Sequence, residues 1–189
     1  MKYEHLKQTP SDINEHLEII KHYSAECEIV AEFGTREVVS TWAILEGLKP
    51  KTTYIGVDVY KSTNLEMAKN YAKQKAINFY FKHGSTLEED FNLGDVDFLF
   101  IDTLHTYNQL SMELNKHGNV AKKYLGFHDV VSFAYTDEQI YGHSDNKVKV
   151  HSENVGLLPA IFQFLKVNPQ WKIDYFAQNN NGLLILKRD

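Results

Sequence analysis

Acidic and histidine side chains follow several of the apolar, strand-like runs of this sequence. In a parallel sheet the carboxyl ends of the strands lie along one edge, so residues that directly follow the strands converge there. Three carboxylates and three imidazoles occupy such positions in the sequence: Asp58, His83, Asp102, His105, His128 and Asp129. The pattern predicts a polar site at one edge of an α/β sheet.

Asp102, His128 and Asp129 have the side-chain types of a divalent cation site. Carboxylates alone indicate Mg²⁺ or Ca²⁺, whereas an imidazole shifts the preference toward Mn²⁺, Fe²⁺ or Zn²⁺. Adjacent side chains of a strand face opposite ways, so His128 and Asp129 share one ion only if the strand has already ended there. The alternative is that His128 packs against a loop while Asp129 caps the next helix.

His105 lies three residues beyond Asp102, where the chain turns from a strand toward a helix. Its reference pKa of about 6.5 suits it to transfer a proton near neutral pH. The alternative is a histidine that begins a helix or positions a substrate without acid–base chemistry.

The stretch 29–36 is an apolar strand that breaks at Gly34 into a helix, and Asp58 ends the next strand. A tight strand-to-helix turn lets backbone N–H groups reach a ligand, and a carboxylate accepts hydrogen bonds from ribose hydroxyls. The combination favours a nucleoside site over an ordinary strand and turn.

Strand-like and helical segments alternate from residue 28 onward. The β-rich runs lie at 28–33, 53–59, 77–82, 96–101 and 124–131, and the helical segments between them lie at 38–46, 65–76 and 108–123. A helical segment at 156–167 then precedes two strand-like runs, 171–177 and 183–186, which flank an Asn-Gly turn. These segments predict an α/β, doubly wound, mostly parallel seven-stranded Rossmann-like sheet that ends in an antiparallel hairpin.

Two further segments, residues 1–27 and 132–155, are expected to pack against the sheet or to cover the site. Residues 1–27 are a helical lead-in, in which Asp12 is expected to cap a helix while Glu15 reaches back. Residues 132–155 are polar and too long for a simple connection, so we expect an active-site lid loop. The whole chain, 1–189, is expected to form one domain.

The composition excludes several classes of protein. Hydrophobic residues make up 43% and charged residues 24% of the 189, as in ordinary globular proteins, and the net charge of −5 argues against nucleic-acid binding. No apolar run approaches the roughly 18 residues of a membrane span, and the start lacks the apolar segment of a secretory signal. The only cysteine, Cys27, forms no internal disulfide and is expected to serve packing. These features predict a cytoplasmic location.

The order and spacing of four segments resemble class I S-adenosylmethionine-dependent methyltransferases over nearly the whole chain: Glu32-Phe33-Gly34-Thr35-Arg36, Asp58, Asp102-Thr103-Leu104-His105-Thr106-Tyr107 and His128-Asp129. The sequence is most similar to the small-molecule O-methyltransferase branch, with its catechol and caffeoyl-coenzyme A types and its macrocin and cephalosporin-hydroxylase-like relatives.

The resemblance implies a role for each matching position. The cofactor, S-adenosylmethionine, would be bound by the first turn and by the next two strand ends: Glu32, Gly34, Thr35, Arg36, Ser40, Asp58 and Ser85. Within this set Asp58 would hold the ribose, and Ser85 would lie near the adenine. The metal would be held by Asp102, His128 and Asp129, and His105 would replace the family's catalytic lysine. Val38 stands where the family has a second glycine.

The expected reaction is methyl transfer to a hydroxyl oxygen of a small molecule, assisted by a divalent cation such as Mg²⁺ or Mn²⁺. A nicotinamide-dependent oxidoreductase is an alternative, disfavoured because the Gly-x-Gly-x-x-Gly motif is missing. A non-catalytic nucleoside-binding module is another, and Val38 is its best support. A membrane or nucleic-acid partner is not expected, and the resemblance leaves a homo-oligomer open.

Overall fold

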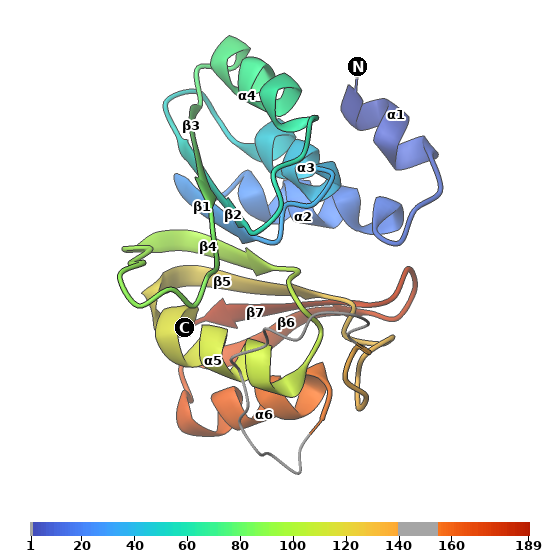
Figure 1. Cartoon of the computed structure of the whole chain (residues 1–189), viewed down its shortest axis with the longest axis vertical. Coiled ribbons are helices and arrows are strands. Elements are labelled where there is room, and N and C mark those ends of the chain that lie inside the picture. Colours follow the sequence, from blue (N-terminus) through green and yellow to red (C-terminus); the bar gives the residue numbers. More distant parts are fainter. Residues whose placement is uncertain (1, 140–154) are drawn as a thin grey trace.

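The computed structural model describes residues 2–139 and 155–189, and within them seven strands form one sheet in the order β3-β2-β1-β4-β5-β7-β6 (Figure 1). The strands are β1 (Ile29–Phe33), β2 (Thr53–Asp58), β3 (Asn78–His83), β4 (Val96–Ile101), β5 (Ala121–His128), β6 (Trp171–Ala177) and β7 (Leu183–Arg188). β1 to β5 are parallel, whereas β7 is antiparallel to both β5 and β6. The predicted sheet, with its closing antiparallel hairpin, is confirmed.

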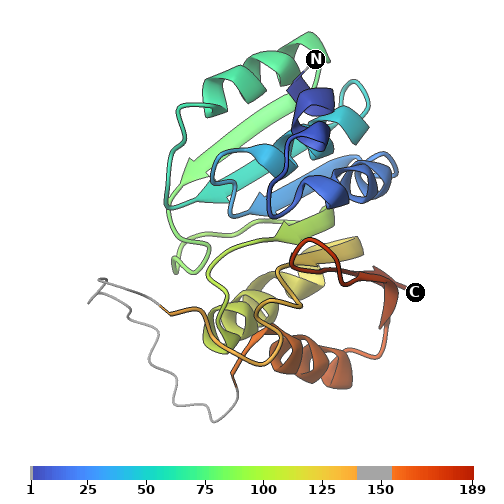
Figure 2. The same ribbon diagram turned by 90° about the vertical axis from the view of Figure 1, so that its right-hand side faces the viewer.

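Helices cover both faces of this sheet. They are α1 (Lys2–Gln8), α2 (Leu17–Ser24), α3 (Val39–Gly47), α4 (Leu65–Gln74), α5 (Tyr107–His117) and α6 (Leu157–Val167), with short 3₁₀ turns at Asn14–His16 and Gly118–Val120. Buried residues of α1 to α4 share one apolar cluster, and those of α5 and α6 share a second. The sheet is therefore the middle of three layers (Figures 1 and 2).

β4 shows why the central strands are almost continuously apolar. Phe98 and Phe100 belong to the cluster under α1 to α4, whereas Leu99 and Ile101 belong to the cluster under α5 and α6. Successive side chains of a strand point to opposite faces, and here both faces are dry. The lack of alternation in the sequence is thus the signature of burial on two sides.

β5 differs from the predicted run at both ends. It begins at Ala121 because α5 already ends at His117, so the helix predicted to reach residue 123 is too long. Lys122 and Lys123 lie in the first part of the strand and form ion pairs with acidic residues. Lys122 Nζ lies 3.0 Å from Asp95 Oδ1, just before β4, and Lys123 Nζ lies 3.5 Å from Asp97 Oδ1, within β4. The strand ends at His128 rather than at residue 131.

The lead-in contains two α-helices, and its predicted cap is one residue out of place. The Ser11 hydroxyl accepts a hydrogen bond from the Asn14 N–H at 3.0 Å, and the Asn14 side chain accepts one from the Ser11 N–H at 3.0 Å. The predicted pairing of Asp12 with Glu15 is therefore wrong. Asp12 instead faces Arg36, with 3.4 Å between carboxylate and guanidinium.

Residues 140–154 of the expected lid loop lie outside the described residues, so its role as a lid stays a prediction. Among the described helices, none is long and apolar enough to cross a bilayer.

The end of β1 is packed tightly between its two neighbouring strands. The Gly34 N–H donates to the Val57 carbonyl at 2.9 Å, and the Asp102 N–H donates to the Phe33 carbonyl at 2.8 Å. Gly34 has a φ of +82°, and a Cβ added to it would lie 1.9 Å from the Asp102 carbonyl oxygen. Residues 34–38 connect β1 to α3, and we call them the first turn. Only glycine fits at position 34, because any side chain would push the first turn away from the end of β4.

We expect Gly34→Ala to lower the free energy of unfolding by more than about 3 kcal/mol, since it adds a backbone clash to the strain of a positive φ. Gly94→Ala is the matched control, because Gly94 has a φ of +72° and nothing lies within 4 Å of an added Cβ. That variant should lose only about 1–2 kcal/mol. Urea unfolding measures both, and equal losses would contradict the packing argument.

Candidate active site

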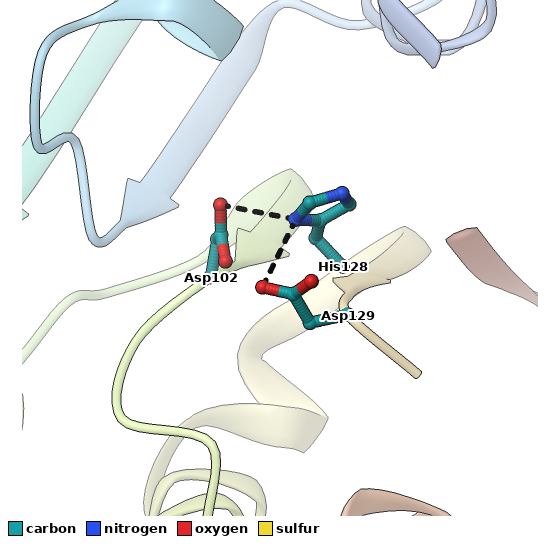
Figure 3. Close-up of side chains that lie close together, drawn as sticks. All are labelled: Asp102, His128 and Asp129. Carbon is teal, nitrogen blue, oxygen red and sulfur yellow. Dashed lines mark ion pairs between the residues drawn. The ribbon is translucent and has the colours of Figure 1, made fainter. Parts of the chain in front are cut away.

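The carboxyl ends of β4 and β5 bring three of the predicted side chains together. Asp102 directly follows β4, His128 is the last residue of β5, and Asp129 comes next. One ligand atom from each of these residues lies within 4.8 Å of the other two (Figure 3). We call Asp102, His128 and Asp129 the carboxylate–imidazole cluster.

The backbone at Asp129 lets two consecutive side chains face the same point. Asp129 has a φ of +60°, in the left-handed region, so the strand has ended there. Figure 3 shows both side chains directed toward Asp102. His128 and Asp129 were expected to share one ion only if the strand had already ended at this position, and it has.

His128 is oriented by two backbone carbonyls. Its Nε2 lies 3.1 Å from the Asp12 oxygen and 3.2 Å from the Asn180 oxygen. Carbonyl oxygens only accept hydrogen bonds, so Nε2 carries a proton. Nδ1 is turned the other way, 3.4 Å from Asp102 Oδ2 and 3.5 Å from Asp129 Oδ2.

Two buried atoms of the carboxylate–imidazole cluster make no hydrogen bond. Within the described residues, these atoms are His128 Nδ1 and Asp129 Oδ1. An imidazole that donates one N–H to a backbone carbonyl and leaves the other nitrogen free is the arrangement typical of metal-binding histidines. Two carboxylates and one such nitrogen fit a divalent cation.

His105 joins the cluster from the loop that precedes α5. Its Nε2 lies 3.2 Å from Asp102 Oδ1 and 3.0 Å from Asp129 Oδ2. Its Nδ1 lies 2.9 Å from Glu138 Oε2, and its ring stacks on Phe133 with the centroids 4.8 Å apart. Sequence reasoning missed Glu138 and Phe133, because both belong to the polar stretch whose motifs give no separate signal.

Charge governs the protonation of this cluster. Burial by itself would lower the pKa of His105 and of His128, but the carboxylates of Asp102 and Asp129 outweigh it and raise each pKa to about 10. The same pairs lower the pKa of Asp102 and of Asp129, although burial opposes this. Two carboxylates held this close are stable only with positive charge beside them, which protons on the imidazoles or a cation supply.

A cavity of about 210 Å³ opens beside the cluster at the end of β1. It is lined by Asp12, Ile13, Gly34, Thr35, Arg36, Glu37, Val39, Ser40 and Asp102. Four of the residues predicted to bind the cofactor are in this lining. Sequence reasoning did not place Asp12 and Ile13 here, because only the tertiary fold lays the lead-in segment across the turn.

Glu32 is not in the cavity lining but contacts Ser40, which is. Its side chain is fully buried and accepts hydrogen bonds from the hydroxyls of Ser40, Thr41 and Tyr54. Burial raises the pKa of Glu32 to about 7, and the three hydroxyls oppose that rise. Glu32 thus holds Ser40, which does line the cavity, and its contact with a cofactor stays a prediction.

Asp58 binds the first turn in this structure. Its Oδ2 accepts the backbone N–H groups of Thr35 and Arg36, each at 2.7 Å, and its Oδ1 accepts the N–H of Tyr60 at 2.7 Å. Asp58 is not in the cavity lining.

Two other residues after β3 or at its end lie apart from the cluster. Ser85 donates its N–H to Glu88 at 2.9 Å and is also not in the cavity lining. His83 contacts the Val59 carbonyl at 2.9 Å, away from the cluster residues that the sequence grouped with it. The ribose role of Asp58 and the adenine role of Ser85 stay predictions.

Val38, which replaces the glycine of the resembled family, has a backbone conformation that favours glycine. Its φ is +62°, a conformation that is strained for a β-branched residue. Its side chain is 1% exposed and packs in the apolar cluster under α1 to α4, while Glu37 and Val39 line the cavity. Val38 therefore leaves the cavity open.

No protein-family model matches the sequence, and no curated protein matches it. Solved structures are similar over nearly the whole chain. A protein of Corynebacterium glutamicum has a TM-score of 0.66 at 11% identity, with 96% of this chain and 83% of that chain covered. A methyltransferase from Geobacter sulfurreducens has a TM-score of 0.62 at 13% identity, with 100% and 88% covered.

An O-methyltransferase from Bacillus cereus in complex with S-adenosylhomocysteine has a TM-score of 0.59 at 11% identity, with 100% of this chain and 89% of that chain covered. At these identities the likeness concerns the fold. The chain has the Rossmann-like fold of these methyltransferases, as the resemblance of its motifs predicted.

Proposed function

We propose that this chain, which has the fold of solved O-methyltransferases, transfers a methyl group from S-adenosylmethionine to a hydroxyl oxygen of a small molecule with the help of a divalent cation. The observation that carries the proposal is the place of Asp102. This residue lines the cavity at the end of β1 and also belongs to the carboxylate–imidazole cluster. A cofactor in the cavity and an acceptor at the cluster would therefore meet at one carboxylate.

The first turn is the proposed binding site for the methionine part of the cofactor, which supplies an electrophilic methyl group when bound. Gly34 lines the cavity together with Thr35, Arg36 and Ser40, so the backbone of the turn would lie against the bound ligand. Ser40 is held by Glu32. For Asp58 to bind the ribose, its carboxylate would exchange the N–H groups of Thr35 and Arg36 for ribose hydroxyls, with Ser85 placed near the adenine.

The cluster is the proposed cation site, with Asp102, His128 Nδ1 and Asp129 as ligands. A bound divalent cation makes a coordinated hydroxyl group more acidic. Among the described residues, His128 Nδ1 and Asp129 Oδ1 are buried and make no hydrogen bond, which supports this assignment. Two oxygens and one imidazole nitrogen suit Mn²⁺ and also accept Mg²⁺.

His105 is the proposed base. Glu138 at its Nδ1 retains a proton on that nitrogen, which leaves Nε2 as the atom that takes the proton of the acceptor hydroxyl. The stacked Phe133 ring holds the imidazole plane. Orientation of acceptor and methyl donor would supply most of the rate enhancement.

We also infer that the protein works in a reducing compartment such as the cytoplasm. Cys27 is buried, donates its thiol to the Tyr23 carbonyl at 3.2 Å, and has its pKa raised to about 12, chiefly by burial. A structural thiol of this kind needs no oxidising environment. Fractionation of the source cells tests the inference, which recovery of the protein outside the cytoplasm would contradict.

Calorimetric titration with S-adenosylhomocysteine and with NAD tests the proposed class of enzyme. We expect the first ligand to bind and the second not to bind, because the first turn lacks the glycine spacing for a dinucleotide. Binding of NAD alone would favour an oxidoreductase. Binding of neither would favour a non-catalytic module.

Asp129→Asn is expected to weaken Mn²⁺ binding by at least about tenfold, because a neutral amide replaces one of two anionic ligands, while S-adenosylhomocysteine still binds. Asp129 is suited to this test because it does not line the cofactor cavity. Asp95→Asn removes the same charge from an exposed residue paired with Lys122 and should change neither affinity. Unchanged Mn²⁺ binding in Asp129→Asn would end the cation proposal.

His105→Gln is expected to lower kcat by about 10²-fold or more, which is typical for the loss of a general base. A base acts when neutral, so the wild-type rate should rise with pH until the pKa of His105 is passed. That pKa is about 10 beside two uncompensated carboxylates, and positive charge on them lowers it, so added Mn²⁺ should shift the rise to lower pH. Pre-steady-state rates measured against pH check this, and an unaltered profile in His105→Gln would contradict the role.

A further inference from the structure

The side-chain amide of Asn180 bridges the turn between β6 and β7 to two residues of the N-terminal segment. Asn180 Nδ2 donates to the Ser11 carbonyl at 2.8 Å, and Asn180 Oδ1 accepts the Glu15 N–H at 3.0 Å. Asn180 has a φ of +48°, a left-handed conformation that asparagine tolerates well. A single residue thus connects segments more than a hundred residues apart in the sequence.

Neighbouring groups reinforce this connection. His16 is 1% exposed, and its Nε2 lies 2.9 Å from the Asn179 oxygen and 3.2 Å from the Asn180 oxygen. The Asn179 amide donates to the Glu15 carboxylate. We call Ser11, Glu15, His16, Asn179 and Asn180 the hairpin clasp.

The hairpin clasp places two carbonyl oxygens against His128. One belongs to Asp12, between two residues of the N-terminal segment that Asn180 binds, and the other belongs to Asn180 itself. Neither carbonyl comes from β5, so β5 alone does not set the rotation of the His128 ring. The His16 and His128 rings also meet edge to face, with centroids 5.8 Å apart.

We propose that Asn180 is a positioning residue for the cation site. Its side chain holds the Asp12 and Asn180 carbonyls where they accept from the His128 Nε2–H, and this directs Nδ1 between Asp102 and Asp129. The inference rests on the proposed cation site. Hydrogen-bond partners of a ligating histidine typically change metal affinity by about 10–100-fold when removed.

Asn180→Gly and Asn181→Gly are a matched pair that tests this role. Both residues have positive φ, +48° and +68°, so glycine fits either position without backbone strain. Only the first substitution removes the amide that bridges to Ser11 and Glu15. The backbone carbonyl of Asn181 accepts hydrogen bonds from the Val131 and Ser132 N–H groups, and these bonds survive the second substitution.

Two measurements on the full chain report the effect: the Kd for Mn²⁺ alone by calorimetry, and the exchange rate of the His128 Nε2–H in a ¹⁵N-histidine NMR spectrum. We expect Asn180→Gly to raise the Kd by about tenfold and to speed exchange of that proton. Asn181→Gly should match the wild type in both. Urea unfolding of the two variants shows that each is folded under the conditions used.

Asn180→Gly with wild-type Mn²⁺ affinity and a slowly exchanging Nε2–H would overturn the positioning role while leaving the cation site intact. Equal losses in both glycine variants would also overturn it, because they would reflect a general loosening of the hairpin. A wild-type protein that binds no Mn²⁺ would instead overturn the cation site, and the role of Asn180 with it.

Discussion

The mutual repulsion of Asp102 and Asp129 is the constraint on which the rest of the site depends. Both carboxylates lie at the carboxyl edge of the sheet with ligand atoms less than 5 Å from those of His128, and Asp129 is 5% exposed. The Asp102 side chain keeps 22% of its surface exposed, so water screens the pair only in part, and positive charge from the protein or from an ion must supply the rest. The imidazoles of His105 and His128 supply it in the protein alone, because the two carboxylates raise the pKa of each imidazole.

Several structural features follow from the need to hold such a cluster. β5 ends at His128, and the next residue, Asp129, has a left-handed backbone conformation, so that both side chains point the same way. His105 is held by Glu138 on one nitrogen and by a stacked phenyl ring, while His128 is held by carbonyls from both ends of the chain. These supports come from the stretch that follows β5, from the N-terminal segment and from the turn between β6 and β7, so the geometry of the cluster depends on the whole edge of the sheet and not on one loop.

The first turn is organised by similar means. Gly34 permits the contact between the ends of β1 and β4 that brings the cavity to Asp102. Asp58 holds the turn from the end of β2 through two backbone N–H groups, and Glu32 holds the start of α3 through Ser40. Acidic residues that family motifs associate with a ligand therefore also support the backbone of the turn. The two roles are compatible, since a carboxylate that accepts backbone N–H groups can exchange them for hydroxyls of a bound molecule.

The sequence by itself determined the sheet, because apolar runs buried on two faces and the Asn-Gly turn of the hairpin are local patterns with local physical causes. It also determined which strand ends carry acids and imidazoles, since that depends only on the order of residues. Element boundaries at residues 117–131 were less accurate, because Lys122 and Lys123 suit a helix as well as an exposed strand start.

Only the tertiary structure decided that His128 and Asp129 face one point, that Glu138 reaches His105, and that Asp58 and Glu32 turn toward the backbone and hydroxyls of the first turn. The contacts of His128 with Asp12 and Asn180, and of Glu138 with His105, join residues far apart in the sequence, and a single left-handed φ sets the direction of Asp129. No residue pattern encodes these long-range contacts or this backbone angle, because they result from how the packed layers bring the chain together.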